Sequence, residues 1–203
     1  GEGARTIAYG AVDRLVRRMV PRNLELSEEQ IHRFMREAIR EAEIGVSEGE
    51  APIGCVIVRG VGEEARIVSR GHNCANRLQE GTAHAEIMAF RNANAENNGG
   101  TPTYPMGADD VALFSTLEPC VMCMGACMES GVAEVYWGLE APADNGTTRV
   151  TPPSSPESND PKKSGGHLRT ECRVAFEQWL EDKKGTEQAK FVEQLLALTA
   201  NAS

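Results

Sequence analysis

The chain has 203 residues, a length that suits one domain with a full hydrophobic core and a short extension, so we expect no second independent domain. Hydrophobic residues make up 40% of the sequence and charged residues 25%, the usual globular mixture, which limits disorder to local segments. The net charge of -9 opposes non-specific attraction to a phosphate backbone, so a polyanionic partner would need a local basic patch.

The first residues of the chain carry a helical pattern. Apolar side chains recur at helical spacing over residues 5–20 until Pro21 breaks the pattern, which predicts an amphipathic helix in an N-terminal extension over residues 1–26. The dense basic run of the sequence also lies here, at Arg14, Arg17, Arg18 and Arg22. We interpret these arginines as a solvated helix face in preference to an RNA contact.

The main domain, expected over residues 27–184, begins with helix and strand patterns in turn. Ser27 with Gln30 three residues later is a capping-box signature, and the apolar face that follows predicts a helix. The β-branched run at 54–58 predicts a buried strand, and a glycine-rich loop connects it to a second strand at 65–68. This order of elements indicates an α/β fold.

The patterns continue to the end of the chain. We expect further helices near residues 83–94, 119–128, 168–183 and 187–198, and further strands near 111–116 and 134–137. Residues 141–166 hold five prolines among many polar residues, which is too long and too polar for an ordinary connection, so we predict a mobile loop. Residues 185–203 are expected to form a separate C-terminal helix.

The cysteines are clustered, with three of the six at Cys120, Cys123 and Cys127. Six cysteines could form a disulfide framework in a secreted chain, but clustered cysteines in a reducing compartment more often bind metal or catalyse. The sequence shows no run of about eighteen apolar residues and no signal-peptide pattern near its start. We therefore expect a cytosolic protein without a membrane partner.

Two short motifs carry the candidate chemistry. His84 and Glu86 open one predicted helix, and Cys120 and Cys123 open another about thirty-five residues later. Cysteines three apart on a helix share a face, so both sulfurs can reach one metal ion while His84 supplies a nitrogen. A fourth thiolate would close this site, so we expect Cys127 to be a core residue.

Three protein ligands leave one tetrahedral position free, which distinguishes a catalytic zinc from a structural one. Zinc lowers the pKa of bound water toward neutrality, and helix N-termini nearby favour thiolates and hydroxide. Glu86 stands two residues after His84, close enough to reach the bound water without being a ligand, and could carry protons to a substrate. Together the motifs match the His-x-Glu and Pro-Cys-x-x-Cys signature of zinc deaminases.

The sequence thereby resembles the cytidine deaminase superfamily, in particular the branch of tRNA adenosine deaminases, guanine deaminases and fungal-type cytosine deaminases. The resemblance covers residues 31–139. Further matches are Ala51-Pro52-Ile53-Gly54, Gly71-His72-Asn73 and the runs 82–89 and 116–125. The resemblance implies a three-layer α/β/α sandwich around a central five-stranded mixed sheet, and a homodimer. It also implies an enzyme that removes an exocyclic amine by hydrolysis, with zinc as cofactor.

The resemblance also implies residues that bind substrate. The family places an asparagine eleven residues before its zinc histidine to hydrogen-bond the base, and Asn73 stands eleven before His84. A turn residue is the alternative interpretation of Asn73. The backbone N–H near Ala85 is expected to help orient the base.

The substrate is the open question within this branch. Bacterial tRNA enzymes resemble the chain strongly but carry cations after the fourth strand, where this sequence has Glu140 and Asp144. His72 and Gln79 belong to a short match with cytosine deaminases, and the long loop could cover a small pocket. We therefore expect a small nucleobase or nucleoside as substrate, with a tRNA wobble adenosine deaminase as the alternative. A zinc-containing interaction domain without catalysis is the second alternative.

Overall fold

The computed structural model describes residues 23–93, 110–154 and 158–200. Five strands form one sheet: β1 (Gly54–Arg59), β2 (Arg66–His72), β3 (Val111–Leu117), β4 (Glu134–Leu139) and β5 (Lys162–Ser164). They lie in the order β2-β1-β3-β4-β5. Because β1 is antiparallel to β2 and β3 whereas β3, β4 and β5 are parallel, the sheet is mixed, as the resemblance implies.

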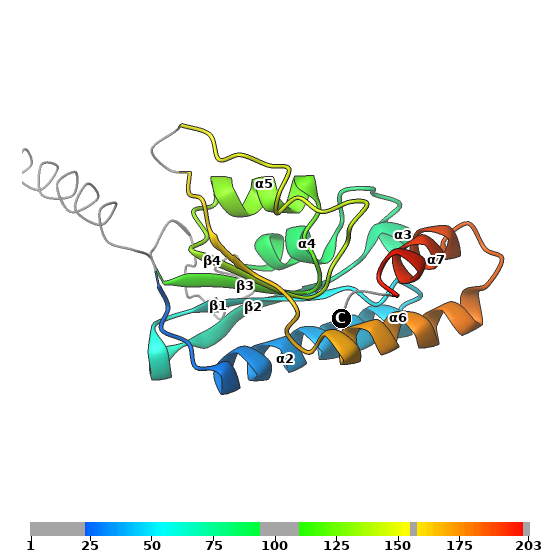
Figure 1. Cartoon of the computed structure of the whole chain (residues 1–203), viewed down its shortest axis with the longest axis horizontal. Helices are drawn as coiled ribbons and strands as arrows, with labels where there is room; N and C mark the ends of the chain where they lie inside the picture. The colour runs from blue at the N-terminus through cyan, green and yellow to red at the C-terminus, as the bar shows by residue number, and fades with distance from the viewer. Residues whose placement is uncertain (1–22, 94–109, 155–157, 201–203) are drawn as a thin grey trace, which may run out of the picture.

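Helices cover both faces of this sheet (Figure 1). The described helices are α2 (Glu28–Ser47), α3 (Ala75–Leu78), α4 (Ala85–Asn92), α5 (Val121–Glu129), α6 (Arg169–Lys183) and α7 (Ala189–Leu198). No helix in this part of the chain has both the length and the apolar character to span a membrane. With α2 and α6 on one face and α4 and α5 on the other, the predicted three-layer sandwich is confirmed. The helix predicted over residues 5–20 lies outside the described residues.

Alternate side chains of the strands build two separate cores. Val56 and Phe114 belong to the core beneath α2 and α6, whereas Ile57 and Leu113 belong to the core beneath α4 and α5. All four side chains are fully buried. Because both faces of the central strands are covered, their sequences are continuous apolar runs without alternating polar residues. Val192 of α7 lies in the first core, so the C-terminal helix is packed into the domain.

The start of α2 follows the predicted capping box. The Ser27 hydroxyl accepts a hydrogen bond from the backbone N–H of Gln30 at 3.2 Å, and the Gln30 side chain accepts one from the backbone N–H of Ser27 at 2.9 Å. These two bonds satisfy donors that a helix N-terminus leaves without intrahelical acceptors.

Two glycines let the neighbouring strands β1 and β2 pass directly against helix backbones. A Cβ at Gly54 would lie 2.1 Å from the carbonyl oxygen of Ala38 in α2. A Cβ at Gly71 would lie 2.4 Å from the backbone nitrogen of Ala89 in α4. Both distances are far below van der Waals contact, so any side chain at these positions would push a helix off the sheet.

The segment 141–166, predicted as a mobile loop, differs from that expectation. It contains β5, which pairs in parallel with β4. It is also held elsewhere, because the N–H of Gly146 donates to Pro119 O at 2.7 Å and the Asn159 side chain donates to Val132 O at 2.7 Å. The three residues of β5, Lys162–Ser164, have no apolar pattern, so sequence periodicity could not predict a strand that depends on pairing with β4.

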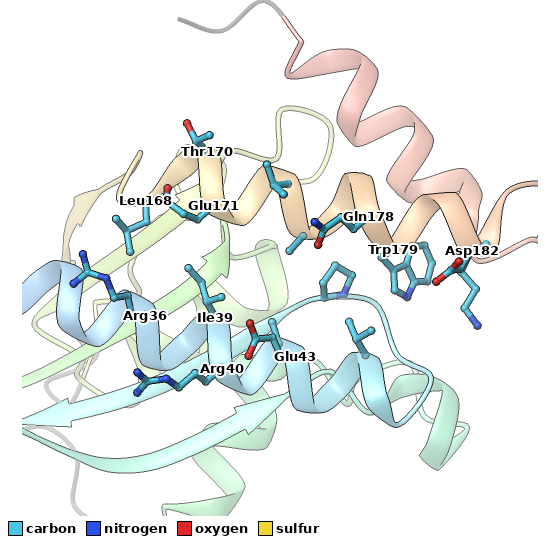
Figure 2. A pocket seen from close by; sticks show the side chains of 16 residues that line it. Arg36, Ile39, Arg40, Glu43, Leu168, Thr170, Glu171, Gln178, Trp179 and Asp182 are labelled. Carbon is cyan, nitrogen blue, oxygen red and sulfur yellow. The ribbon is translucent and has the colours of Figure 1, made fainter.

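A groove of about 930 Å³ runs between α2 and α6 (Figure 2). Arg36, Glu43, Trp179 and Asp182 are among the residues that line it, so its charge is mixed. The groove lies in the helix layer opposite α4 and α5 and is therefore separate from the motif residues.

Candidate active site

The two sequence motifs meet where two helices begin. His84 is the N-cap of α4, and Cys120 is the N-cap of α5, with Cys123 in the first turn of the same helix. Both N-cap residues have extended backbone angles, and neither side chain caps its own helix, so both are free to face outward from the helix end. The positive ends of two helices therefore converge on the three side chains. The helix α5 begins at Val121, so Pro119 precedes the N-cap instead of lying in the first turn as predicted.

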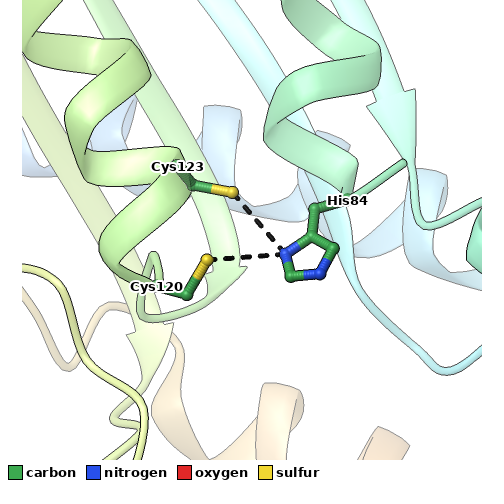
Figure 3. A group of neighbouring side chains, drawn as sticks. All are labelled: His84, Cys120 and Cys123. Atoms are coloured by element: carbon green, nitrogen blue, oxygen red, sulfur yellow. Dashed lines mark hydrogen bonds between the residues drawn. The ribbon is translucent and has the colours of Figure 1, made fainter. Parts of the chain in front are cut away.

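The geometry of these three side chains fits a tetrahedral zinc ion. The Nδ1 atom of His84 lies 3.5 Å from the sulfur of Cys120 and 3.7 Å from the sulfur of Cys123 (Figure 3). Ordinary zinc–sulfur and zinc–nitrogen bond lengths at a tetrahedral angle place ligand nitrogen and sulfur about 3.6 Å apart. Within the described part of the chain, these three residues are the group that could hold a metal ion, with all ligand atoms within 4.8 Å of one another.

The protonation of the two cysteines also suits a metal. The hydrogen bond from Cys123 and the neighbouring His84 lower the pKa of the Cys120 thiol to about 4. The adjacent Cys120 and burial together raise the pKa of the Cys123 thiol well above its ordinary value. Zinc binds cysteine as the thiolate, so the low pKa of Cys120 favours binding, and a proton on Cys123 would be displaced by a divalent cation.

Glu86 lies against this group without belonging to it. Its side chain is buried, and one carboxylate oxygen lies 3.3 Å from the sulfur of Cys123. The other oxygen accepts a hydrogen bond from the Ser115 hydroxyl at 3.0 Å. Burial raises the pKa of Glu86, so this carboxyl group takes up a proton more readily than an exposed one.

Ala85 adjoins His84 in sequence, and the segment that carries Asn73 is hydrogen-bonded to the segment just before His84. Asn73 follows β2 and is 9% exposed, so it is not a solvated turn residue. The next residue, Cys74, donates its backbone N–H to Ala83 O at 2.9 Å, which brings this segment alongside His84. Ala85 is the first residue of α4, where backbone N–H groups lack intrahelical acceptors.

The segment after β4 forms another side of the site, which sequence reasoning missed. The buried carboxylate of Glu118 accepts the backbone N–H of Ala141 at 2.9 Å and the hydroxyl of Thr147. The backbone of Asn145 pairs with that of Cys120. In the sequence Glu118 lies two residues before Cys120. This closeness to a predicted metal ligand is the one feature of the sequence that could have indicated that Glu118 supports the site.

The acidic residues after β4 differ from the expectation that they repel phosphate. Arg169 of α6 binds the Glu140 carboxylate with two donors, one of them at 2.8 Å, so the charge of Glu140 is paired. The guanidinium of Arg149 donates to the carbonyl oxygens of Pro142 and Ala143 at 3.1 and 2.7 Å, which places a cation near Asp144. The local charge is therefore less acidic than the sequence indicates.

Two residues matched to cytosine deaminases take no part in the site geometry. The His72 ring lies between the carboxylates of Glu41 and Glu48, at 3.4 and 3.1 Å, on the α2 side of β2. Gln79 ends α3, and its side chain donates to Asn76 O. Cys127 is fully buried in the core beneath α5, as predicted.

The sequence matches a known family over the metal-binding group and Glu86. The family model of the cytidine and deoxycytidylate deaminase zinc-binding region covers residues 28–139, more than half of the chain. A tRNA-specific adenosine deaminase of Streptococcus pyogenes is 40% identical over 111 residues, which are 55% of this chain and 63% of that protein. The chain therefore matches less than two thirds of that relative's length.

Solved structures share the fold. A structure from a study of A-to-I editing by tRNA:A34 deaminases is similar with a TM-score of 0.55 and 29% identity, covering 70% of this chain and 98% of that one. A guanine deaminase from Nitrosomonas europaea is similar with a TM-score of 0.56 over 73% of this chain and 84% of that one, but its 19% identity supports a shared fold alone. The match of the zinc-binding region to the residues that converge here shows that the chain belongs to the cytidine and deoxycytidylate deaminase family.

Proposed function

We propose that this chain is a zinc-dependent hydrolytic deaminase that converts an adenosine of tRNA to inosine. The observation that carries the proposal is the 40% identity to a tRNA-specific adenosine deaminase over 111 residues. The relatives at this identity are named for tRNA. This proposal replaces the small nucleobase expected from the sequence.

In this proposal His84, Cys120 and Cys123 hold zinc through one nitrogen and two sulfurs. Zinc held by these residues would lower the pKa of a water molecule at the remaining ligand position toward neutrality. The reaction adds water across the amine-bearing carbon of adenine, breaks its C–N bond and releases ammonia.

Glu86 would move the protons that this reaction requires. Its carboxylate takes a proton from water and gives it to the ring nitrogen next to the reacting carbon. It then takes the second proton from the hydroxyl group now on that carbon and delivers it to the leaving amine. Burial raises its pKa, which suits a group that must hold a proton briefly. The Ser115 hydroxyl binds one oxygen at 3.0 Å and leaves the other oxygen on the side of Cys123.

The charge distribution bears on the choice between RNA and a small base. Pairing of Glu140 with Arg169 and the position of Arg149 weaken the argument that the segment after β4 repels phosphate. The net charge of -9 remains in favour of a free nucleobase or nucleoside, which is the second candidate.

A parallel assay of zinc-loaded protein separates the candidates. The substrates are an anticodon stem-loop with adenosine at the wobble position, the same stem-loop with guanosine there, and free adenine, guanine, cytosine and their nucleosides. We expect inosine only in the adenosine stem-loop, at a rate that falls steeply with salt because cations contact the phosphates. The matched control, Glu86→Gln, should form inosine at least about 10²-fold more slowly.

Turnover of a small base with both stem-loops inert would establish the second candidate. Absence of turnover on every substrate, in protein shown to contain zinc, would overturn both and support a non-catalytic zinc domain.

A further inference from the structure

Glu50 is a fully buried carboxylate surrounded by N–H donors. It accepts the side-chain amide of Asn73 at 2.9 Å, the backbone N–H of Asn76 at 3.2 Å and the backbone N–H of Arg77 at 2.7 Å. The two backbone donors belong to the first turn of α3, so the carboxylate caps that short helix from a distant part of the chain. The third donor is the residue predicted to bind substrate.

The end of α2 fixes the position of Glu50. The N–H of Glu50 donates to Gly45 O at 2.9 Å, and the N–H of Gly49 donates to Val46 O at 3.0 Å. Gly49 has a φ of +89°, which only glycine adopts readily, and this bond pattern is a Schellman motif. The carboxylate is therefore held by a rigid helix terminus.

The bond to Glu50 determines which way the Asn73 amide faces. A carboxylate accepts hydrogen bonds and has none to donate, so Asn73 must turn its NH₂ group toward Glu50. The carbonyl oxygen Oδ1 then points to the opposite side of the amide. Among the described residues no hydrogen bond to this oxygen is formed. The adjoining Cys74 pairs with Ala83, so the segment that carries this oxygen runs alongside the segment that carries His84.

We propose that Glu50 is a positioning residue for substrate recognition: it fixes the sense of the Asn73 amide so that Oδ1 accepts a hydrogen bond from an N–H or O–H group of the substrate. This inference rests on the proposed function, because it requires that Asn73 contacts the substrate. It assigns the site a preference for a ligand that presents a donor at this position. The free ring nitrogens of adenosine are all acceptors, so for the proposed substrate this donor would be a ribose hydroxyl; a ligand with only an acceptor there would meet the Asn73 oxygen and be rejected.

Exchange of the two functional groups provides the test. Glu50→Gln replaces a carboxylate, which only accepts hydrogen bonds, with an amide whose NH₂ group must face one of the three N–H donors. We therefore expect kcat/KM to fall about tenfold, mainly through a higher KM. Asn73→Asp sets two carboxylates against each other and should lose more. The double variant Glu50→Gln/Asn73→Asp restores a donor–acceptor pair with an oxygen still toward the substrate, and should recover at least about tenfold over Asn73→Asp.

Glu134→Gln is the matched control for these variants. Glu134 is also a fully buried carboxylate. It is the first residue of β4, whereas the site lies beyond the last residue of that strand, and it accepts hydrogen bonds from the backbone N–H of Leu24 and the hydroxyl of Tyr136. It should lower the melting temperature without changing KM. If Glu50→Gln leaves KM unchanged, or if the double variant is no better than Asn73→Asp, the proposal is wrong.

A second measurement keeps this inference distinct from the proposed function. If zinc-loaded wild type deaminates nothing, the proposed function fails, and the amide of Asn73 is then examined by NMR. We expect one Asn73 Hδ2 proton to resonate at the low field typical of a bond to a carboxylate, and to move in Glu50→Gln but not in Glu134→Gln. An Asn73 amide with the shifts of a solvated side chain, unchanged in Glu50→Gln, would overturn the positioning role.

Discussion

The substitution Gly71→Ala tests how closely α4 must lie against the sheet. Its Cβ would lie 2.4 Å from the nitrogen of Ala89 and 2.6 Å from the carbonyl oxygen of Ala85, against ordinary contacts of 3.4 Å or more. Both are backbone atoms, so no side chain can rotate away, and α4 must move by about 1 Å. Because His84 is the N-cap residue of α4 and Glu86 lies in the first turn of that helix, the displacement reaches both residues.

The size of the effect follows from that displacement. Overpacking of this kind costs about 1–3 kcal/mol, which lowers the melting temperature of a domain of this size by about 2–12 °C. A misplacement of about 1 Å in a catalytic arrangement reduces turnover about 10²-fold. We expect both losses, measured by thermal denaturation and by product formation at saturating zinc, with zinc content determined by mass spectrometry.

Two further glycines serve as controls. Gly54→Ala introduces the same clash against the backbone of α2, which carries none of the candidate metal or proton-transfer residues, so it should destabilise the protein with less loss of turnover. Gly125→Ala adds a methyl group in α5 where nothing lies within 4 Å, and should be neutral or stabilising by up to about 1 kcal/mol. A Gly71→Ala protein with wild-type melting temperature and turnover would refute the reasoning.

Three other outcomes are expected. Glu86→Gln should retain one zinc per chain in metal analysis but lose about 10²–10⁴-fold in turnover, and activity within a few fold of wild type would reassign the proton transfer. Cys123→Ala should lower zinc content below half an equivalent and reduce the melting temperature, because metal binding contributes to folding; full zinc occupancy would exclude Cys123 as a ligand. The hydrogen bond from Arg169 lowers the pKa of Glu140 below its ordinary 4.5, so this pair stabilises the fold above about pH 4.5 and the stabilisation is lost as the pH falls through the lowered pKa. Glu140→Gln should therefore melt below wild type at pH 7, with a deficit corresponding to about 0.2–1 kcal/mol that shrinks below pH 4.5, and a deficit that grows in acid would contradict this assignment.

Local sequence signals predicted most of the fold and the metal group. The capping box at Ser27 and the helix starts at His84 and Cys120 are each defined by a few adjacent residues, and the structure confirms all three. Their convergence could be inferred because ligand spacing limits the arrangements that can hold one metal ion.

The supporting residues could not be predicted because they act over long sequence separations. Glu50 and Asn73 are 23 residues apart, and Glu118 and Thr147 are 29 apart. The sequence has 30 acidic residues, and nothing in the pattern around Glu50 distinguishes a buried carboxylate from a solvated one. The pairing of Glu140 with Arg169 depends in the same way on where α6 packs.

The attachment of the segment after β4 has a consequence for changing substrate range. Ala141 and Thr147 are hydrogen-bonded to the Glu118 carboxylate, whereas residues 142–144 lie between these two residues in sequence. A library of variants that randomises residues 142–144 and keeps Ala141 and Thr147 would vary one side of the site while the metal ligands stay the same. Substitution of Thr147 would act differently, because it removes a hydrogen bond to Glu118, which is joined through Pro119 to the metal ligand Cys120. Variants selected at Thr147 for a new substrate would therefore also lose metal affinity.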